Sequence, residues 1–186
     1  MPGRVYLELL EVAVGRYGYV TPADARALGI DPVQLRLMHH RGALRRVARG
    51  VYRFPVVPVT ALDQYMEATL WPAVPTVLSH ETALDLHDLC DVNPARIHIS
   101  VPAGYRVRRD VPKMYVVHRR SLPQEDVTLF EGVPVVTVRR AILDGIGADL
   151  GANLIDQAID TARRRGLLGR DEIRALGRSR RSPRAA

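Results

Sequence analysis

The sequence contains one cysteine, Cys90, and one lysine, Lys113, among its 186 residues. A single cysteine excludes an internal disulfide framework and any metal cluster held by several thiolates. We therefore expect a reduced, cytoplasmic protein. The other 26 of its 27 basic residues are arginines. The planar guanidinium group suits bidentate contacts with phosphate or guanine.

Long hydrophobic runs are also missing. No apolar segment approaches the roughly 18 residues that a membrane span needs, and acids interrupt the apolar N-terminus, so we expect neither a membrane helix nor a signal peptide. The sequence has no glycine-rich phosphate loop and no serine in a nucleophile elbow. We therefore expect no cofactor and no catalytic residues. An enzyme site in the second half, built from Glu81, Asp85 and His98, stays open as the less favoured alternative.

Positive charge is concentrated at the two ends of the chain. Residues 1–60 contain nine basic and four acidic side chains, whereas residues 61–177 contain 14 and 16. Residues 178–186 add four basic side chains and no acid. A basic first part and a nearly neutral second part indicate two surfaces for two partners.

The first sixty residues predict a helix-turn-helix followed by a basic hairpin. Thr21-Pro22 and Asp31-Pro32 are helix starts, and Gly29 ends the helix between them. Arg49-Gly50 is the turn of the hairpin. The expected helices cover residues 4–17, 22–28 and 32–41, and the expected strands cover residues 44–48 and 51–54. This order is typical of a winged helix-turn-helix, and double-stranded DNA is the partner it indicates.

The third helix has two alternative buried faces. One combines Leu35 with Met38 and the other combines Val33 with Leu37. We favour the first, because Leu44 then continues the same apolar side into the hairpin. This choice directs the polar and basic side chains of the helix outward, and we expect these and the arginines of the hairpin to contact bases or phosphates. They are Gln34, Arg36, His40, Arg41, Arg45, Arg46, Arg49 and Arg53. The alternative is a solvated basic surface without a ligand.

The second half alternates helices and strands. A helix over residues 61–70 is expected first, and then one over residues 80–89 that is capped by Ser79. Strands are expected over residues 97–101, 114–118 and 133–138, and helices over residues 138–146, 151–165 and 170–177. Basic residues near the strand ends indicate a second positive patch that nearby acids mostly cancel. They are Arg106, Arg108, Arg109, Lys113, Arg119 and Arg120.

Two pairs of histidines are candidates for metal ligands. His80 and His87 are seven residues apart, on one face of the expected helix, but the segment lacks the HExxH pattern. His39 and His40 are adjacent and do not share a helix face. We therefore expect no metal site.

Most of the chain, about residues 4–175, resembles the AbiEi-type antitoxins of bacterial type IV toxin–antitoxin systems. The matching segments are residues 18–21 (GYVT), 42–52 (GALRRVARGVY), 78–84 (LSHETAL), 97–102 (IHISVP) and 136–144 (VTVRRAILD). The resemblance implies an antitoxin that represses its own operon through operator DNA. It also implies a cognate toxin that is a nucleotidyltransferase.

Together the pattern and the resemblance predict an α+β protein. A winged helix-turn-helix domain (1–58) is followed by a connecting segment (59–75). A C-terminal α/β antitoxin domain (76–177) has a small, mostly antiparallel sheet and C-terminal helices, and a basic, disordered tail covers residues 178–186. One wing and helix cover a short site, so we expect paired copies on inverted repeats. Alternatives are a stand-alone winged-helix regulator and, less favoured, a nuclease or toxin-modifying enzyme.

Overall fold

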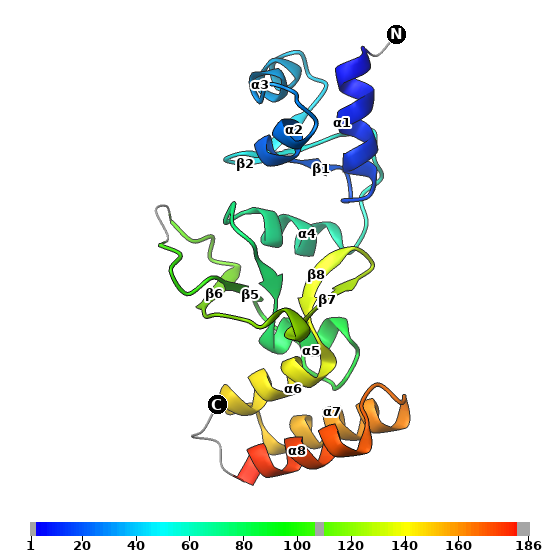
Figure 1. The fold of residues 1–186 in the computed structure, drawn as a ribbon, viewed down its shortest axis with the longest axis vertical. Coiled ribbons are helices and arrows are strands. Elements are labelled where there is room, and N and C mark those ends of the chain that lie inside the picture. Colours follow the sequence, from blue (N-terminus) through cyan, green and yellow to red (C-terminus); the bar gives the residue numbers. More distant parts are fainter. Residues whose placement is uncertain (1–2, 107–109, 182–186) are drawn as a thin grey trace. The chain divides into compact units, whose positions relative to one another are not determined.

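The computed structural model describes residues 3–106 and 110–181 and divides the chain into two compact units, 1–74 and 75–186 (Figure 1). The mixture of helices and small sheets confirms the α+β class. No helix in the described ranges is both long and apolar enough to span a bilayer.

The first unit contains four helices and a three-stranded antiparallel sheet. Its elements are α1 (Arg4–Val14), β1 (Tyr19–Val20), α2 (Pro22–Ala27), α3 (Val33–His40), β2 (Arg45–Ala48), β3 (Val51–Arg53) and α4 (Asp63–Leu70). The strand order is β1-β3-β2. The core joins α1, α2, α3 and the sheet through Leu9, Ala25, Leu35, Leu44 and Phe54.

Local capping explains why the two short helices begin where they do. Thr21 and Asp24 form a reciprocal capping box at the start of α2, with Pro22 at its first position. Asp31 accepts a hydrogen bond at 2.8 Å from the Val33 N–H at the start of α3. Gly29 stands between the helices at φ +69°, a left-handed conformation that glycine adopts without a steric penalty. The sequence signals for this turn are therefore confirmed.

The second unit contains a five-stranded sheet with the order β6-β5-β4-β8-β7. Its strands are β4 (Val77–Leu78), β5 (Ile97–Val101), β6 (Tyr115–Arg119), β7 (Val127–Phe130) and β8 (Val133–Val136). Two of these pairings are parallel, β5 with β6 and β4 with β8, and two are antiparallel. The sheet is thus mixed, and the expectation of a mostly antiparallel sheet is wrong for this unit. One of the two parallel pairings involves β4, a two-residue strand that the sequence pattern did not reveal.

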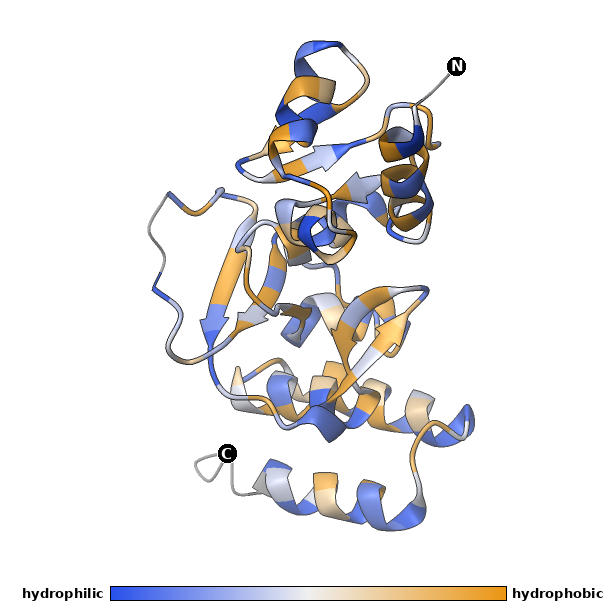
Figure 2. Ribbon diagram, turned by 45° about the horizontal axis from the view of Figure 1, so that its top comes forward, coloured by the Kyte–Doolittle hydropathy of each residue, from blue (hydrophilic) through white to orange (hydrophobic). Residues whose placement is uncertain are grey.

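Helices and a short 3-10 turn complete the second unit. They are α5 (His80–Leu86), η1 (Gln124–Asp126), α6 (Val138–Gly147), α7 (Ala152–Arg164) and α8 (Arg170–Arg181). Figure 2 shows both hydrophobic and hydrophilic residues along α6, α7 and α8, as expected for helices with one buried side. Residues 178–181 belong to α8, so the expected disordered tail is wrong there. Residues 182–186 lie outside the described ranges.

Candidate functional site

Helix α3 buries Leu35 and Met38, as the sequence predicted, and leaves the alternative face exposed. Leu35 is fully buried and Met38 is 8% exposed, whereas Leu37 is 38% exposed. Leu44 continues the buried side at 2% exposure. The opposite side of α3 therefore faces away from the core. It presents Gln34, which is half-buried, and the exposed side chains of Arg36, His40 and Arg41.

The hairpin of β2 and β3 adds three exposed arginines. Arg45 and Arg46 lie on β2, and Arg49 lies in the turn beside Gly50, whose φ is +76°. The register shifts between Arg46 and Ala48, and the Arg46 Nε donates to the Ala48 carbonyl at 3.4 Å. Such a bulge bends and twists a strand. The hairpin is thus a short, twisted ribbon with guanidinium groups at its edge.

The arginines of the chain differ in whether an acid partner neutralises them. Within the described residues no ion pair involves Arg36, Arg41, Arg45 or Arg46. Many arginines of the second unit do have acid partners. These are Arg120, Arg139, Arg140, Arg163, Arg165, Arg174 and Arg180. Part of the uncompensated positive charge therefore lies on α3 and β2. Other arginines of the second unit also have no ion pair among the described residues, namely Arg96, Arg106, Arg119, Arg164, Arg170 and Arg178.

Arg53 does not share this surface. It is 8% exposed, and its Nε donates to the Asp63 carboxylate at 2.8 Å. Its Nη2 donates to the carbonyls of Val57 and Pro58, both at 3.0 Å. The guanidinium group is used inside the unit, where it joins β3 to the start of α4. We therefore remove Arg53 from the residues expected to contact DNA.

A second contact attaches α4 to the same sheet. The Tyr19 hydroxyl donates to the Glu67 carboxylate at 3.0 Å. Burial, together with the negative charge of Glu67, raises the pKa of Tyr19 above its ordinary value, so its hydroxyl stays a donor. Residues 59–74, which we expected to connect two domains, lie in the first compact unit.

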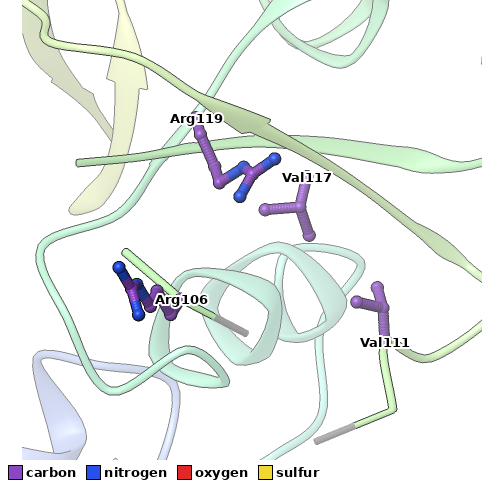
Figure 3. Close-up of a pocket in the computed structure, with 4 residues that line it drawn as sticks. All are labelled: Arg106, Val111, Val117 and Arg119. Atoms are coloured by element: carbon purple, nitrogen blue, oxygen red, sulfur yellow. The ribbon is translucent and has the colours of Figure 1, made fainter. Parts of the chain in front are cut away.

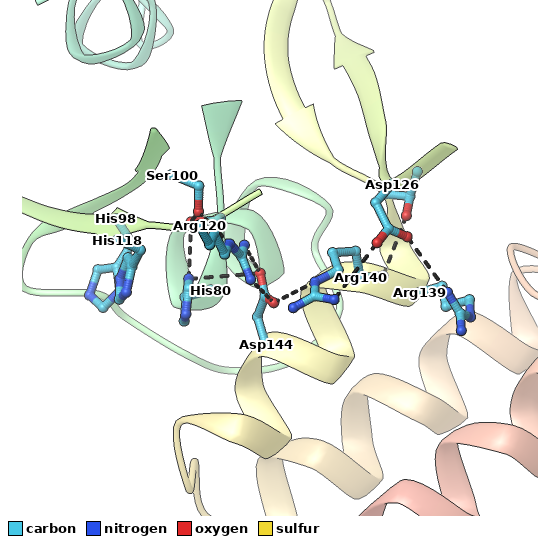
Figure 4. A network of polar contacts seen from close by, with 11 residues as sticks. His80, His98, Ser100, His118, Arg120, Asp126, Arg139, Arg140 and Asp144 are labelled. Atoms are coloured by element: carbon cyan, nitrogen blue, oxygen red, sulfur yellow. Dashed lines mark hydrogen bonds and ion pairs between the residues drawn. The ribbon is translucent and has the colours of Figure 1, made fainter. Parts of the chain in front are cut away.

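The second unit contains a polar cluster on the side of its sheet formed by β4, β5 and the edge strand β6 (Figure 4). The parallel register of β5 and β6 pairs Ser100 with His118. Side chains alternate across a strand, so His98 lies on the same face as Ser100, and Arg120 continues the face of His118. His80 begins α5, directly after β4.

A buried carboxylate, Asp144 of α6, organises one side of this cluster. Its side chain is fully buried and accepts hydrogen bonds from both terminal nitrogens of Arg120 and, at 2.8 Å, from Arg140 Nε. Burial alone would raise the pKa of Asp144, but Arg120, His80 and Arg140 lower it below its ordinary value. Arg120 also donates to Ser100 Oγ at 2.9 Å. The carboxylate is thus ionised and held in place.

Ser79 has a different role from the one expected. Its side chain makes no capping hydrogen bond to α5. Instead, its Oγ accepts from Ser100 Oγ at 2.8 Å and lies 3.0 Å from His80 Nδ1. The sequence predicted a helix cap because serine is common at the residue before a helix. In the structure the Ser79 hydroxyl is hydrogen-bonded to Ser100 on the neighbouring strand instead.

Three histidines, here called the histidine cluster, converge beside this network: His80, His98 and His118. One ring nitrogen from each lies within 4.8 Å of the others. His118 Nε2 lies 3.2 Å from His98 Nδ1, and the rings of His80 and His118 stack at 3.6 Å between centroids. Burial lowers the pKa of His80 to about 3 and that of His118 to about 4. The rings are therefore neutral at physiological pH.

The sequence did not group these histidines. It paired His80 with His87, but the Nε2 of His87 lies 2.8 Å from the carbonyl oxygen of Val136. The available signal was the alternation of His98 with Ser100 and of His118 with Arg120. It requires the parallel pairing of the two strands, which sequence alone does not supply.

A shallow hollow of about 460 Å³ lies near the expected second positive patch (Figure 3). Arg106, Val111, Val117 and Arg119 line it. Arg120 turns instead into the buried network, while Arg108 and Arg109 lie outside the described residues. The expected patch is thus divided between a surface hollow and the interior.

Residues 8–55 match a family model described as "Transcriptional regulator, AbiEi antitoxin". This match confirms the resemblance for the helix-turn-helix region. Among curated proteins, no sequence matches the chain. The crystal structure of the RV2827C protein from Mycobacterium tuberculosis has a similar fold, with a TM-score of 0.54 and 17% identity. The match covers 95% of this chain and 72% of that one.

Proposed function

We propose that this protein represses its own operon by binding operator DNA, since residues 8–55 are similar to a family model described as a transcriptional regulator and AbiEi antitoxin. We further propose that it neutralises a cognate nucleotidyltransferase toxin. The DNA-binding element is a winged helix-turn-helix, in which α3 is the recognition helix and the β2–β3 hairpin is the wing. The observation that carries the proposal is the uncompensated arginine surface of α3 and β2.

Each part of this surface has a distinct expected task. Gln34 and Arg36 lie near the N-terminus of α3, where recognition helices read base edges in the major groove. Arginine pairs with guanine and glutamine with adenine through two hydrogen bonds each. Arg45, Arg46 and Arg49 neutralise phosphates or enter the minor groove. His40 and Arg41, at the C-terminal end of α3, contact the backbone.

The unit covers a short stretch of duplex, so the operator is expected to contain inverted repeats bound by paired copies. The second unit carries the toxin-facing function in this proposal. Residues 75–177 hold 14 basic and 14 acidic side chains, and only residues 178–186 add an excess of four basic ones. This balance and the ion-paired arginines of the unit favour a protein partner over a polyanion.

Salt-dependent binding tests the DNA interface directly. The affinity of the full chain for operator DNA is measured by fluorescence anisotropy at several salt concentrations. Each phosphate contact contributes about −0.9 to the slope of log K against log salt. We expect Arg45→Ala, Arg46→Ala and Arg49→Ala combined to weaken binding to every duplex and to reduce that slope by about 2 to 3.

A matched control removes the same charge from the second unit. Arg163, Arg164 and Arg174 are exposed on α7 and α8, and their combined replacement by alanine changes the net charge equally. The control is expected to retain the wild-type slope within about 0.5. Equal losses in both triple variants would reject the hairpin as the contact surface and leave only net charge as the cause.

A stand-alone regulator without a toxin partner fits the same DNA-binding surface. Co-expression with the neighbouring gene product separates the two functions. An antitoxin rescues growth of cells that express a nucleotidyltransferase toxin, and Arg45→Ala with Arg46→Ala retains that rescue when both genes are under a foreign promoter. Failure of the full chain to rescue would favour the stand-alone regulator.

A further inference from the structure

The histidine cluster brings together three elements of the second unit. His80 follows β4, His98 lies on β5 and His118 lies on β6. We propose that these three side chains bind one divalent transition-metal ion, with Zn²⁺ preferred. The site is independent of the DNA-binding surface and of the proposed function.

The pair His98 and His118 already has the separation that such an ion requires. A tetrahedral Zn²⁺ with Zn–N distances of about 2.0–2.1 Å separates two ligand nitrogens by about 3.3 Å. The observed distance from His118 Nε2 to His98 Nδ1 is 3.2 Å. Without an ion, one of these nitrogens donates a proton to the other. With an ion, the donor ring changes tautomer, so that its proton moves to its other ring nitrogen, and both lone pairs point at the metal.

His80 completes the site with its second nitrogen. Its Nδ1 lies 3.0 Å from Ser79 Oγ and 3.7 Å from an oxygen of Asp144, which leaves Nε2 for the metal. Metal-binding histidines commonly donate their other N–H to a carboxylate or another acceptor, which fixes the tautomer and the ring orientation. Ser79 supplies an acceptor here, and the Asp144 carboxylate lies beside it, as Figure 4 shows for His80 and Asp144.

Because the rings of His80 and His118 are stacked, they must move before both can bind the same metal ion. Their planes differ by 13°, and a metal lies in the plane of each ligand ring. One ring must therefore turn, and the longest nitrogen separation must shorten from within 4.8 Å to about 3.3 Å. His80 also has φ +53°, uncommon for a residue other than glycine. The surrounding structure thus holds it in place at a conformational cost.

The charges around the cluster allow a cation. Arg120 lies nearby and opposes it, but Asp144 neutralises this guanidinium through two hydrogen bonds. Burial lowers the pKa of His98, the negative charge of Glu81 opposes this lowering, and the positive charge of Arg96 adds to it. Neutral imidazoles suit Zn²⁺, Cu²⁺ and Ni²⁺, whereas Mg²⁺ and Ca²⁺ prefer oxygen ligands. Among the described residues the cluster offers three protein ligands, so water or a partner's side chain takes the fourth position.

Titration of the tag-free full chain with ZnCl₂ in an isothermal calorimeter tests the proposal. We expect one equivalent of Zn²⁺ to bind, and at least a tenfold loss of affinity in His98→Ala and in His118→Ala. Co²⁺ provides an independent signal, because its visible absorption bands are intense only in a four-coordinate site. MgCl₂ is expected to give no saturable binding at the same concentrations.

His87→Gln is the matched control. This histidine belongs to the same unit, and a glutamine amide can still donate to the Val136 carbonyl. The control is expected to keep the wild-type affinity and the Co²⁺ spectrum. Circular dichroism of each variant establishes that it is folded. Should His98→Ala or His118→Ala misfold, the conservative His118→Asn and His98→Asn replace them.

The results that would overturn the proposal are specific. The site is refuted if the wild-type chain binds no Zn²⁺ in the micromolar range. It is equally refuted if a folded variant lacking both His98 and His118 binds Zn²⁺ as tightly as the wild type, because the metal then lies elsewhere. In either case the three rings are a packed histidine cluster without a ligand.

Discussion

Replacement of Arg53 by methionine should destabilise the first unit without changing its DNA contacts. The substitution keeps an unbranched side chain but leaves the Asp63 carboxylate, 6% exposed, without its cation. Loss of one partner from a buried ion pair costs about 3–5 kcal/mol. Asp63 keeps its hydrogen bonds from the Thr60 N–H at 2.7 Å and the Thr60 hydroxyl at 3.1 Å. We therefore expect the lower value, about 3 kcal/mol.

The only tryptophan makes this loss measurable in the full chain. Trp71 follows α4 in the first unit and is 5% exposed, so its fluorescence reports the unfolding of this unit. For a dependence of about 1.5 kcal/mol per molar urea, a loss of about 3 kcal/mol lowers the midpoint by about 2 M. Arg45→Met, at an exposed position, should change stability by less than about 0.5 kcal/mol.

A second substitution tests the mechanism. Adding Asp63→Asn to Arg53→Met removes the unpaired charge while the amide oxygen still accepts from Thr60. Much of the lost stability should return, because replacing both partners of a buried pair is often nearly neutral. An unchanged midpoint in Arg53→Met would refute the ion pair as a stabilising contact. A reduced salt slope of DNA binding in the folded variant would return Arg53 to the interface.

Three other substitutions test separate parts of the structure. Arg36→Ala should relax the choice of operator sequence by about 1–3 kcal/mol, measured by competition between operator and mutated duplexes, with little change in salt slope. Asp144→Ala should cost about 3–5 kcal/mol in the thermal unfolding of the second unit, because Arg120 loses its buried partner; a melting temperature within one degree of the wild type would contradict this. Burial lowers the pKa of His87, so the unfolded chain takes up a proton near pH 6.5 while the folded ring resists it. Stability should thus fall as pH drops below about 6.5, by up to about 1.4 kcal/mol per pH unit from this residue. His87→Gln should reduce, but not abolish, the change in second-unit urea midpoints across that range, because burial also lowers the pKa of His80, His98 and His118.

The helices of the first unit were predictable because their signals are local. Proline after a capping residue, glycine at the end and the spacing of Leu35 and Met38 all act within one or two turns. The position of Leu44 was enough to choose between the two possible buried faces of α3. Arg53 was misassigned because its partner, Asp63, lies beyond the hairpin, and exposure cannot be read from residue type.

Strand pairing limited the prediction of the second unit. The two residues of β4 are too few for an alternating pattern, yet this strand joins β5 to β8. The β7–β8 hairpin turns at Glu131-Gly132, where both residues have positive φ, a conformation typical of a two-residue turn. Only the paired sheet brings His80, His98 and His118 together, so no spacing rule along the chain identifies them.

The exposed arginines and the buried Arg53 of this protein should respond differently to salt. Ions in solution weaken contacts made in water but have little effect on a charge pair enclosed by protein. The bare guanidinium groups of α3 and β2 are accessible to competing ions, whereas Arg53 and Asp63 are shielded from them. In the proposed function, a rise in ionic strength should therefore detach the protein from nucleic acid well before it loosens the fold, so that release is reversible.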